Sequence, residues 1–131
     1  MALIWLELVL HFLQKKTNLK IAFIGDIVGR PGRKLISHYL KKIKEEYNID
    51  CVIANGENAS HGFGLTVKNA NELFKYGIDI ITGGNHTWDK KQDILALLED
   101  NRILRPANYP NGVAGKGVGI YDINGTKLAV I

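Results

Sequence analysis

The sequence predicts an α/β fold: a parallel βαβαβ sheet with flanking helices, followed by a C-terminal hairpin. Short apolar runs alternate with stretches of helical periodicity, a pattern that produces parallel strands joined by right-handed crossovers. A polar segment rich in glycine or asparagine follows each of the first three runs. With 131 residues, 46% of them apolar, the chain can form one domain with a modest core.

The first βα unit is expected between residues 19 and 47. Residues 19–24 form an apolar run that predicts a buried strand, and a loop with Gly29, Pro31 and Gly32 follows. A helix is predicted over 32–47, because apolar residues recur there at steps of three and four. This apolar side comprises Leu35, Ile36, Tyr39, Leu40 and Ile43.

The second unit repeats this order. Residues 50–54 predict a second strand, and 66–76 a second helix. Thr66 is placed to cap the N-terminus of that helix, and Gly77 marks its end.

The third unit leads into the hairpin. A strand is expected over 78–82, a helix over 89–99, and a short strand at 103–104. The apolar side of the helix would comprise Ile94, Leu95, Leu97 and Leu98. The strands 118–123 and 126–131 are joined by Asn124-Gly125, the strongest two-residue hairpin signal.

Charge and cysteine content narrow the class of protein. The net charge of +4 is mild, and much of it lies on the lysines at 41, 42 and 44, which read as the solvated face of a helix. No basic arm, aromatic stacking series or zinc-finger spacing appears, so direct DNA binding is not expected. The single cysteine, Cys51, opens an apolar strand. It indicates a core position and a reducing, cytoplasmic location.

Residues 1–18 form an extension that we expect to be helical. Residues 1–13 are mostly apolar but are interrupted by Glu7 and His11, and they are too short for a membrane span. Positive charge follows the apolar part and no cleavage site is visible, which argues against a signal peptide. Two interpretations of this extension stay open: a helix that lies on the domain or on a partner, and a misplaced start codon. A homo-oligomer is also possible.

Polar residues follow each of the first three strands. Asp26, Glu57-Asn58 and Asn85-His86 would meet at one sheet edge, since the carboxyl ends of parallel strands converge on one crevice. This oxygen-rich set suits a hard or borderline metal ion and, through it, a phosphate ester. For Asp26 the alternatives are an acid at a helix N-terminus and an Asx turn. The glycine spacing matches neither a dinucleotide fingerprint nor a phosphate-binding loop.

The other two strand ends carry more specific residues. Glu57 could bridge two metal ions, and Asn58 could add a neutral ligand; the alternatives for Glu57 are ribose binding and plain solvent exposure. His86 could protonate a departing alkoxide, because its pKa lies near working pH, and Asp89 could hold its ring in one tautomer. The alternative is that Asn85 caps the next helix beside a surface histidine. His61, on a loop at the same edge, could touch substrate.

Four stretches of the sequence carry a family resemblance. They are Ile24-Gly25-Asp26-Ile27-Val28-Gly29-Arg30, Ala54-Asn55-Gly56-Glu57-Asn58-Ala59, Gly84-Asn85-His86-Thr87-Trp88-Asp89 and Arg105-Pro106-Ala107-Asn108-Tyr109-Pro110. In this order they resemble the calcineurin-like metallophosphoesterases, and specifically their bacterial YmdB-like branch. The resemblance extends from residue 19 to residue 131.

The resemblance implies a four-layer α/β/β/α fold, of which this chain would be the N-terminal half, and a phosphodiesterase acting on small phosphate esters such as 2′,3′-cyclic nucleotides. Its cofactors would be two divalent or trivalent metal ions, iron or manganese. Asp26 would bind one ion, Glu57 would bridge both, Asn58 would assist at the first and Asn85 would bind the second. His86 would be the proton donor.

The sequence departs from the family in one respect. The family also draws histidine ligands from its later half, including a paired His-x-His, and no histidine follows His86. We therefore expect 19–131 to be a truncated metallophosphoesterase domain that is weakly active or inactive. The alternatives are a non-catalytic nucleotide-binding α/β domain and an interaction protein that docks through its N-terminal segment.

Overall fold

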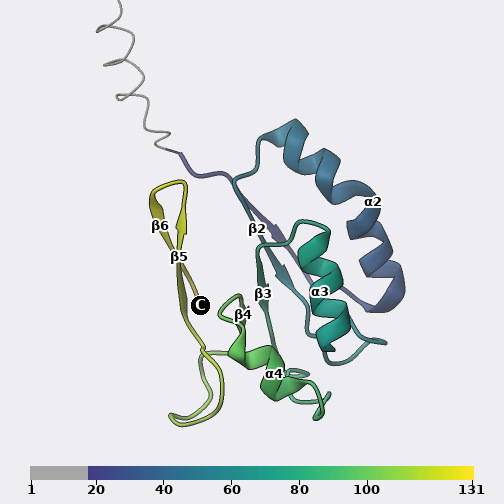
Figure 1. The fold of residues 1–131 in the computed structure, drawn as a ribbon, viewed down its shortest axis with the longest axis vertical. Helices are drawn as coiled ribbons and strands as arrows, with labels where there is room; N and C mark the ends of the chain where they lie inside the picture. Colours follow the sequence, from purple (N-terminus) through teal and green to yellow (C-terminus); the bar gives the residue numbers. More distant parts are fainter. Residues whose placement is uncertain (1–17) are drawn as a thin grey trace, which may run out of the picture.

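The computed structural model describes residues 18–131 and arranges them in three layers (Figure 1). A four-stranded parallel sheet, in the order β1-β2-β3-β4, lies between a layer of helices and a two-stranded antiparallel hairpin. The strands are β1 (Ile21–Ile24), β2 (Cys51–Asn55), β3 (Ile80–Thr82), β4 (Ile103–Leu104), β5 (Gly119–Ile123) and β6 (Thr126–Val130). The helices are α2 (Gly29–Tyr47), α3 (Val67–Lys75) and α4 (Ile94–Glu99). The predicted fold class is confirmed.

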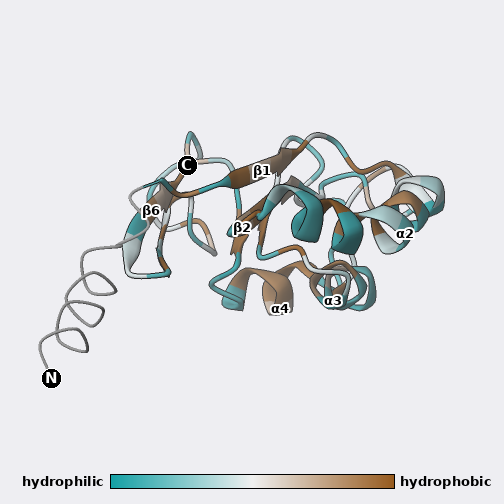
Figure 2. Cartoon of the chain, turned by 90° about the horizontal axis from the view of Figure 1, so that it is seen from above, coloured by the Kyte–Doolittle hydropathy of each residue, from teal (hydrophilic) through white to brown (hydrophobic). Residues whose placement is uncertain are grey.

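Alternating side chains of β2 build the two cores on opposite faces of the sheet. Val52 and Ala54 belong to the cluster on the helix side, and Cys51 and Ile53 to the cluster that contains Val130 of the hairpin. All four β2 side chains are buried, as expected for a strand covered on both faces. Figure 2 shows the same apolar concentration along strands β1 and β2, with the more polar helix α2 outside.

Two local signals predicted from the sequence are present in the structure. The Thr66 hydroxyl accepts a hydrogen bond from the Asn69 amide at 3.2 Å, so the predicted N-cap is confirmed. In the hairpin turn Asn124 has φ 52° and Gly125 φ 81°. Two successive left-handed residues are what a type I′ turn requires.

Three local predictions are wrong. The third helix starts at Ile94 rather than at 89, because residues 85–93 form successive turns and the Asp93 carboxylate accepts from the Val67 amide at 2.9 Å. Its Leu95 is exposed. Strand β1 is only half-buried, because it is an edge strand whose Phe23 lies open.

The predicted apolar side of the first helix is also only partly correct. Leu40 is buried and Ile36 packs against the helix-side core, whereas Leu35 and Tyr39 are 61% and 57% exposed. The three- and four-residue spacing predicts a broad apolar side of the helix, but only the part of that side with Ile36 and Leu40 packs against the core.

The helical extension predicted over residues 1–18 falls outside the described residues, apart from residue 18 itself. Within residues 18–131, no helix has the length and apolar character needed to cross a membrane.

The burial of Cys51 leads to a test of the core. Its side chain is fully buried, and burial raises the pKa of the thiol, so the reactive thiolate is scarce at pH 8 and reagents must wait for opening of the structure. We expect Ellman's reagent to label the folded chain at least about 100-fold more slowly than the chain in urea. Equal rates in the two conditions would contradict a buried β2.

Candidate functional site

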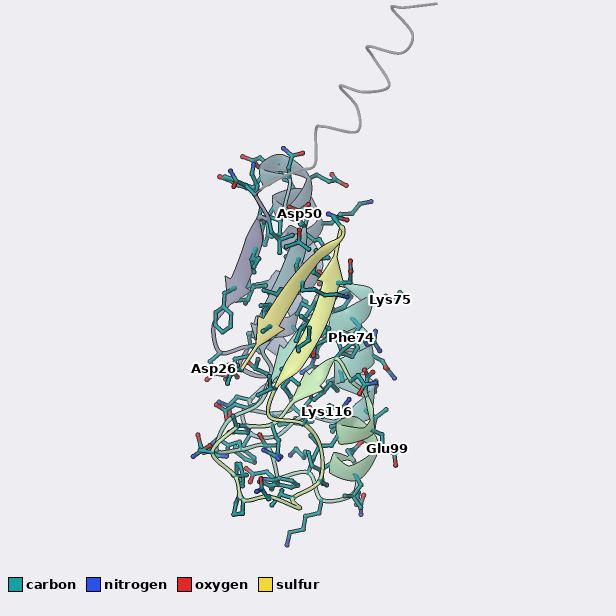
Figure 3. The ribbon with its side chains drawn as sticks, turned by 90° about the vertical axis from the view of Figure 1, so that its left-hand side faces the viewer. Asp26, Asp50, Phe74, Lys75, Glu99 and Lys116 are labelled. Carbon is teal, nitrogen blue, oxygen red and sulfur yellow. The ribbon has the colours of Figure 1, made fainter. Side chains whose placement is uncertain are left out.

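The three polar segments meet at one edge because the hydrogen-bonded ladder continues past the strand ends. The Ile27 amide donates to the Asn55 carbonyl at 3.1 Å, and the Gly56 amide donates to the Thr82 carbonyl at 3.0 Å. The loops after β1, β2 and β3 are thereby held side by side. Figure 3 shows Asp26 and Asp50 at opposite ends of the sheet: Asp26 follows the carboxyl end of β1, and Asp50 lies just before β2.

Asp26 is joined directly to Asn58. The Asn58 side-chain amide Nδ2 donates to Asp26 Oδ2 at 2.8 Å. The backbone carbonyl of Asn58 accepts from the amides of Gly29 and Gly62, at 2.9 and 3.2 Å. The loop after β2 is therefore tied both to the acid after β1 and to the start of α2.

The side-chain oxygen of Asn58 is the most informative atom of the site. Among the described residues, Asn58 Oδ1 is buried and has no hydrogen-bond partner. Buried acceptors are rarely left unpaired, and such an exception calls for a donor or an ion. An unpaired amide oxygen beside the Asp26 carboxylate fits a bound cation.

Glu57 links the second loop to the third. Its Oε2 accepts a hydrogen bond from the His86 backbone amide at 2.9 Å, and its own amide donates to Asn55 Oδ1 at 3.1 Å. A Cβ atom on Gly84 would overlap the Glu57 carboxylate as it is placed. The glycine at position 84 thus leaves room for the carboxylate beside the third loop, and Glu57 is not simply solvent-exposed.

His86 is oriented by Asp89. Its Nδ1 lies 2.7 Å from Asp89 Oδ2, so Nδ1 carries the proton and donates while Nε2 stays available. The predicted contact between the two side chains is therefore present. Asn85 is exposed at the tip of this loop and does not cap a helix, because the residue at the N-cap of α4 is Asp93.

The structure also bears on the alternatives for Asp26 and on the position of His61. The N-cap position of α2 is Val28, and its first turn contains no acidic residue, so Asp26 is not placed as a helix N-terminal acid. His61 is exposed in the left-handed conformation, with φ 62°, on the loop that contacts Asn58.

The side chains at this edge offer oxygen ligands that suit a metal ion, but these ligands are few. Asp26 and Glu57 offer carboxylates, and Asn58 and Asn85 offer amide oxygens. Residues 18–131 contain no group of three or more histidine, cysteine or acidic residues placed to hold an ion. The described residues thus fit one face of a metal site in which the carboxylate and amide oxygens are hard ligands.

Sequence reasoning missed two supporting residues. Asn55 orders the turn through the Glu57 amide, and its own amide reaches the Gly83 carbonyl at 3.4 Å. Gly84 makes room for the Glu57 carboxylate. The repeated strand-glycine-polar pattern marks both positions, but only their contacts in the folded chain show what they do.

Comparison with known proteins identifies the family. A family model described as YmdB-like protein matches residues 22–131. The chain belongs to this YmdB-like family. It is 49% identical over 114 residues to the 2′,3′-cyclic-nucleotide 2′-phosphodiesterase of Bacillus subtilis, an alignment that covers 86% of this chain and 43% of the relative. The chain thus spans less than half the length of that relative.

Two solved structures share the fold of this chain. A hypothetical protein from Thermus thermophilus superposes with a TM-score of 0.78 at 41% identity, over 83% of this chain and 42% of that one. A structure described as a novel phosphatase from Mycoplasma pneumoniae superposes with a TM-score of 0.80 at 35% identity, over 85% of this chain and 41% of that one. The relatives named for an activity are phosphodiesterases or phosphatases.

The close approach at Gly84 yields a test of the geometry. In Gly84→Ala the new methyl group would collide with the Glu57 carboxylate. Because the carboxylate is the end of a flexible side chain, we expect it to move away from the third loop at a cost of no more than about 0.5 kcal/mol of unfolding free energy. The His86 amide resonance should move as its hydrogen bond to Glu57 breaks. The control is Gly25→Ala, where no atom lies within 4 Å of the added Cβ. If both variants match the original protein in the His86 resonance, the placement of Glu57 is wrong.

The His86–Asp89 contact predicts a tautomer. Long-range proton–nitrogen NMR of the neutral ring should show the proton on Nδ1 of His86, and Asp89→Ala should abolish that preference. His38 is an internal control, because its Nδ1 donates to the Lys34 carbonyl at 2.7 Å and should keep its proton in both proteins. A His86 ring protonated on Nε2 alone in the original protein would exclude the contact.

Proposed function

We propose that this chain supplies one face of the active site of a metal-dependent phosphodiesterase that acts on small phosphate esters, with 2′,3′-cyclic nucleotides as the substrate class. The observation that carries the proposal is the pair of links at one sheet edge, Asp26 to Asn58 and Glu57 to the His86 amide. Membership of the YmdB-like family and the activity named for the Bacillus subtilis relative support it.

The proposed ligand roles follow the position of each oxygen. Asp26 and the unpaired Oδ1 of Asn58 would hold one ion, Glu57 would bridge to a second, and Asn85 would bind that second ion. Iron or manganese are the proposed metals. When bound, a metal pair supplies a hydroxide nucleophile and stabilises the charge that develops on the phosphoryl oxygens.

The amides have an electrostatic purpose in this proposal. A phosphodiester carries negative charge, and each further carboxylate near the ions would repel it. Asn58 and Asn85 add oxygen ligands without adding charge, so the cations keep a net attraction for the anionic substrate.

His86 would deliver the proton to the leaving oxygen. With Nδ1 held by Asp89, a protonated ring can donate only from Nε2, which fixes both the tautomer and the orientation of the acid. The backbone of the same residue donates to Glu57. One residue therefore couples the position of the proton donor to that of the bridging carboxylate.

Metal binding provides the primary test. We expect Mn²⁺ binding by the purified chain, followed by electron paramagnetic resonance, to weaken at least about tenfold in Asp26→Ala, because a removed carboxylate takes a charged ligand with it. Glu46→Gln, an exposed acid on α2, is the matched control and should bind as the original does. With only two carboxylates among the proposed ligands, Asp26 and Glu57, we expect slow hydrolysis of 2′,3′-cyclic AMP that disappears in Asp26→Ala.

Two results would contradict the proposal. One is Mn²⁺ affinity that is the same in Asp26→Ala and in Glu46→Gln. The other is turnover of the cyclic nucleotide that persists in Asp26→Ala, because that turnover would not depend on the proposed ligand of the first metal ion.

A further inference from the structure

An aromatic side chain stands exposed beside the proposed proton donor. Phe63 is 53% exposed, and its ring centroid lies 6.2 Å from that of His86, with the ring planes 42° apart. The ammonium of Lys90 lies over the Phe63 ring, 5.1 Å from its centroid. No part of the metal or proton-transfer chemistry requires this ring.

The loop that carries Phe63 is firmly built. The Ser60 amide donates to the Gly64 carbonyl at 3.0 Å, and the Gly62 amide donates to the Asn58 carbonyl at 3.2 Å. Ser60 is fully buried, and its hydroxyl accepts from the Asn69 side chain at 2.7 Å. The loop that carries Phe63 is therefore bonded to the backbone of Asn58 and is anchored in the core through Ser60.

The backbone around Phe63 has an unusual conformation. His61, Gly62 and Gly64 all have left-handed φ, between 62° and 93°. A Cβ atom on Gly64 would lie 2.6 Å from Lys90 Cγ, so the loop also packs tightly against the segment that follows His86. An ordered loop that keeps a large apolar ring half in water gives up hydrophobic burial, and a flat ligand would recover it.

We infer that Phe63 is a stacking platform for the nucleobase of the substrate, which rests on the proposed function for the position of the phosphate. Aromatic rings stack on bases of any sequence, because every base has a π-face. Lys90 covers part of the ring and leaves the rest for a base. The proximity of Phe63 to His86 places that base on the same side of the sheet edge as the scissile phosphate.

The test compares a nucleotide with its base-free counterpart. The ligands are adenosine 2′,3′-cyclic phosphate and 1-O-methylribose 2,3-cyclic phosphate, with diamagnetic Mg²⁺ present so that ligand NMR is readable. In Phe63→Leu we expect the nucleotide to bind about tenfold more weakly and the upfield ring-current shift of adenine H2 and H8 to vanish. Phe63→Tyr should keep both within about twofold, and the base-free ligand should not distinguish the variants.

Tyr39→Leu is the matched control, since Tyr39 is an equally exposed aromatic on α2; it should bind both ligands as the original does. Equal melting temperatures guard against loss of the fold. The inference is overturned if Phe63→Leu binds the nucleotide normally, if it weakens both ligands alike, or if the original protein binds neither. Failure of the proposed function is a separate result, namely Mn²⁺ binding that ignores Asp26→Ala.

Discussion

Parallel hydrogen bonding among β1, β2 and β3 is the constraint on which the site depends. The register pairs Ile24 with Ala54 and Asn55 with Thr82, so the strands end almost together. Because the ladder extends one step into the loops, the residues that follow each strand lie at the same edge of the sheet. Polar side chains far apart in the chain become neighbours without any helix that would have to position them.

Two kinds of contact then convert neighbouring loops into a site. One is the link between a backbone amide and a carboxylate, which draws Glu57 onto the third loop over the bare Gly84. The other is the amide–carboxylate pair of Asn58 and Asp26. Together they tie all three loops, and they leave one buried amide oxygen without a donor. A cation at this point would satisfy that oxygen and be paired with the Asp26 carboxylate beside it.

Much of the fold could be predicted from local sequence, because the burial of β2, the Thr66 cap and the Asn124-Gly125 turn are encoded within a few residues. The failures depend on the surroundings. Periodicity found the apolar stripe of α2, but it could not tell that Leu35 faces away from the sheet. The late start of α4 depends on Asp93 meeting Val67, 26 positions away. The candidate site residues were predictable as strand-end polar groups, whereas the contacts of Asn55 with Gly83 and of Gly84 with Glu57 join different strand ends and are not encoded locally.

The central claim is that Asp26, Glu57, Asn58 and Asn85 surround a common metal position. Anomalous diffraction from a crystal of the chain soaked in Mn²⁺ would test it most directly. The expected result is a manganese peak within coordinating distance of Asn58 Oδ1 and the Asp26 carboxylate, with any second peak reached by Glu57. Manganese bound only at other surfaces, with these four side chains uncoordinated, would contradict the claim.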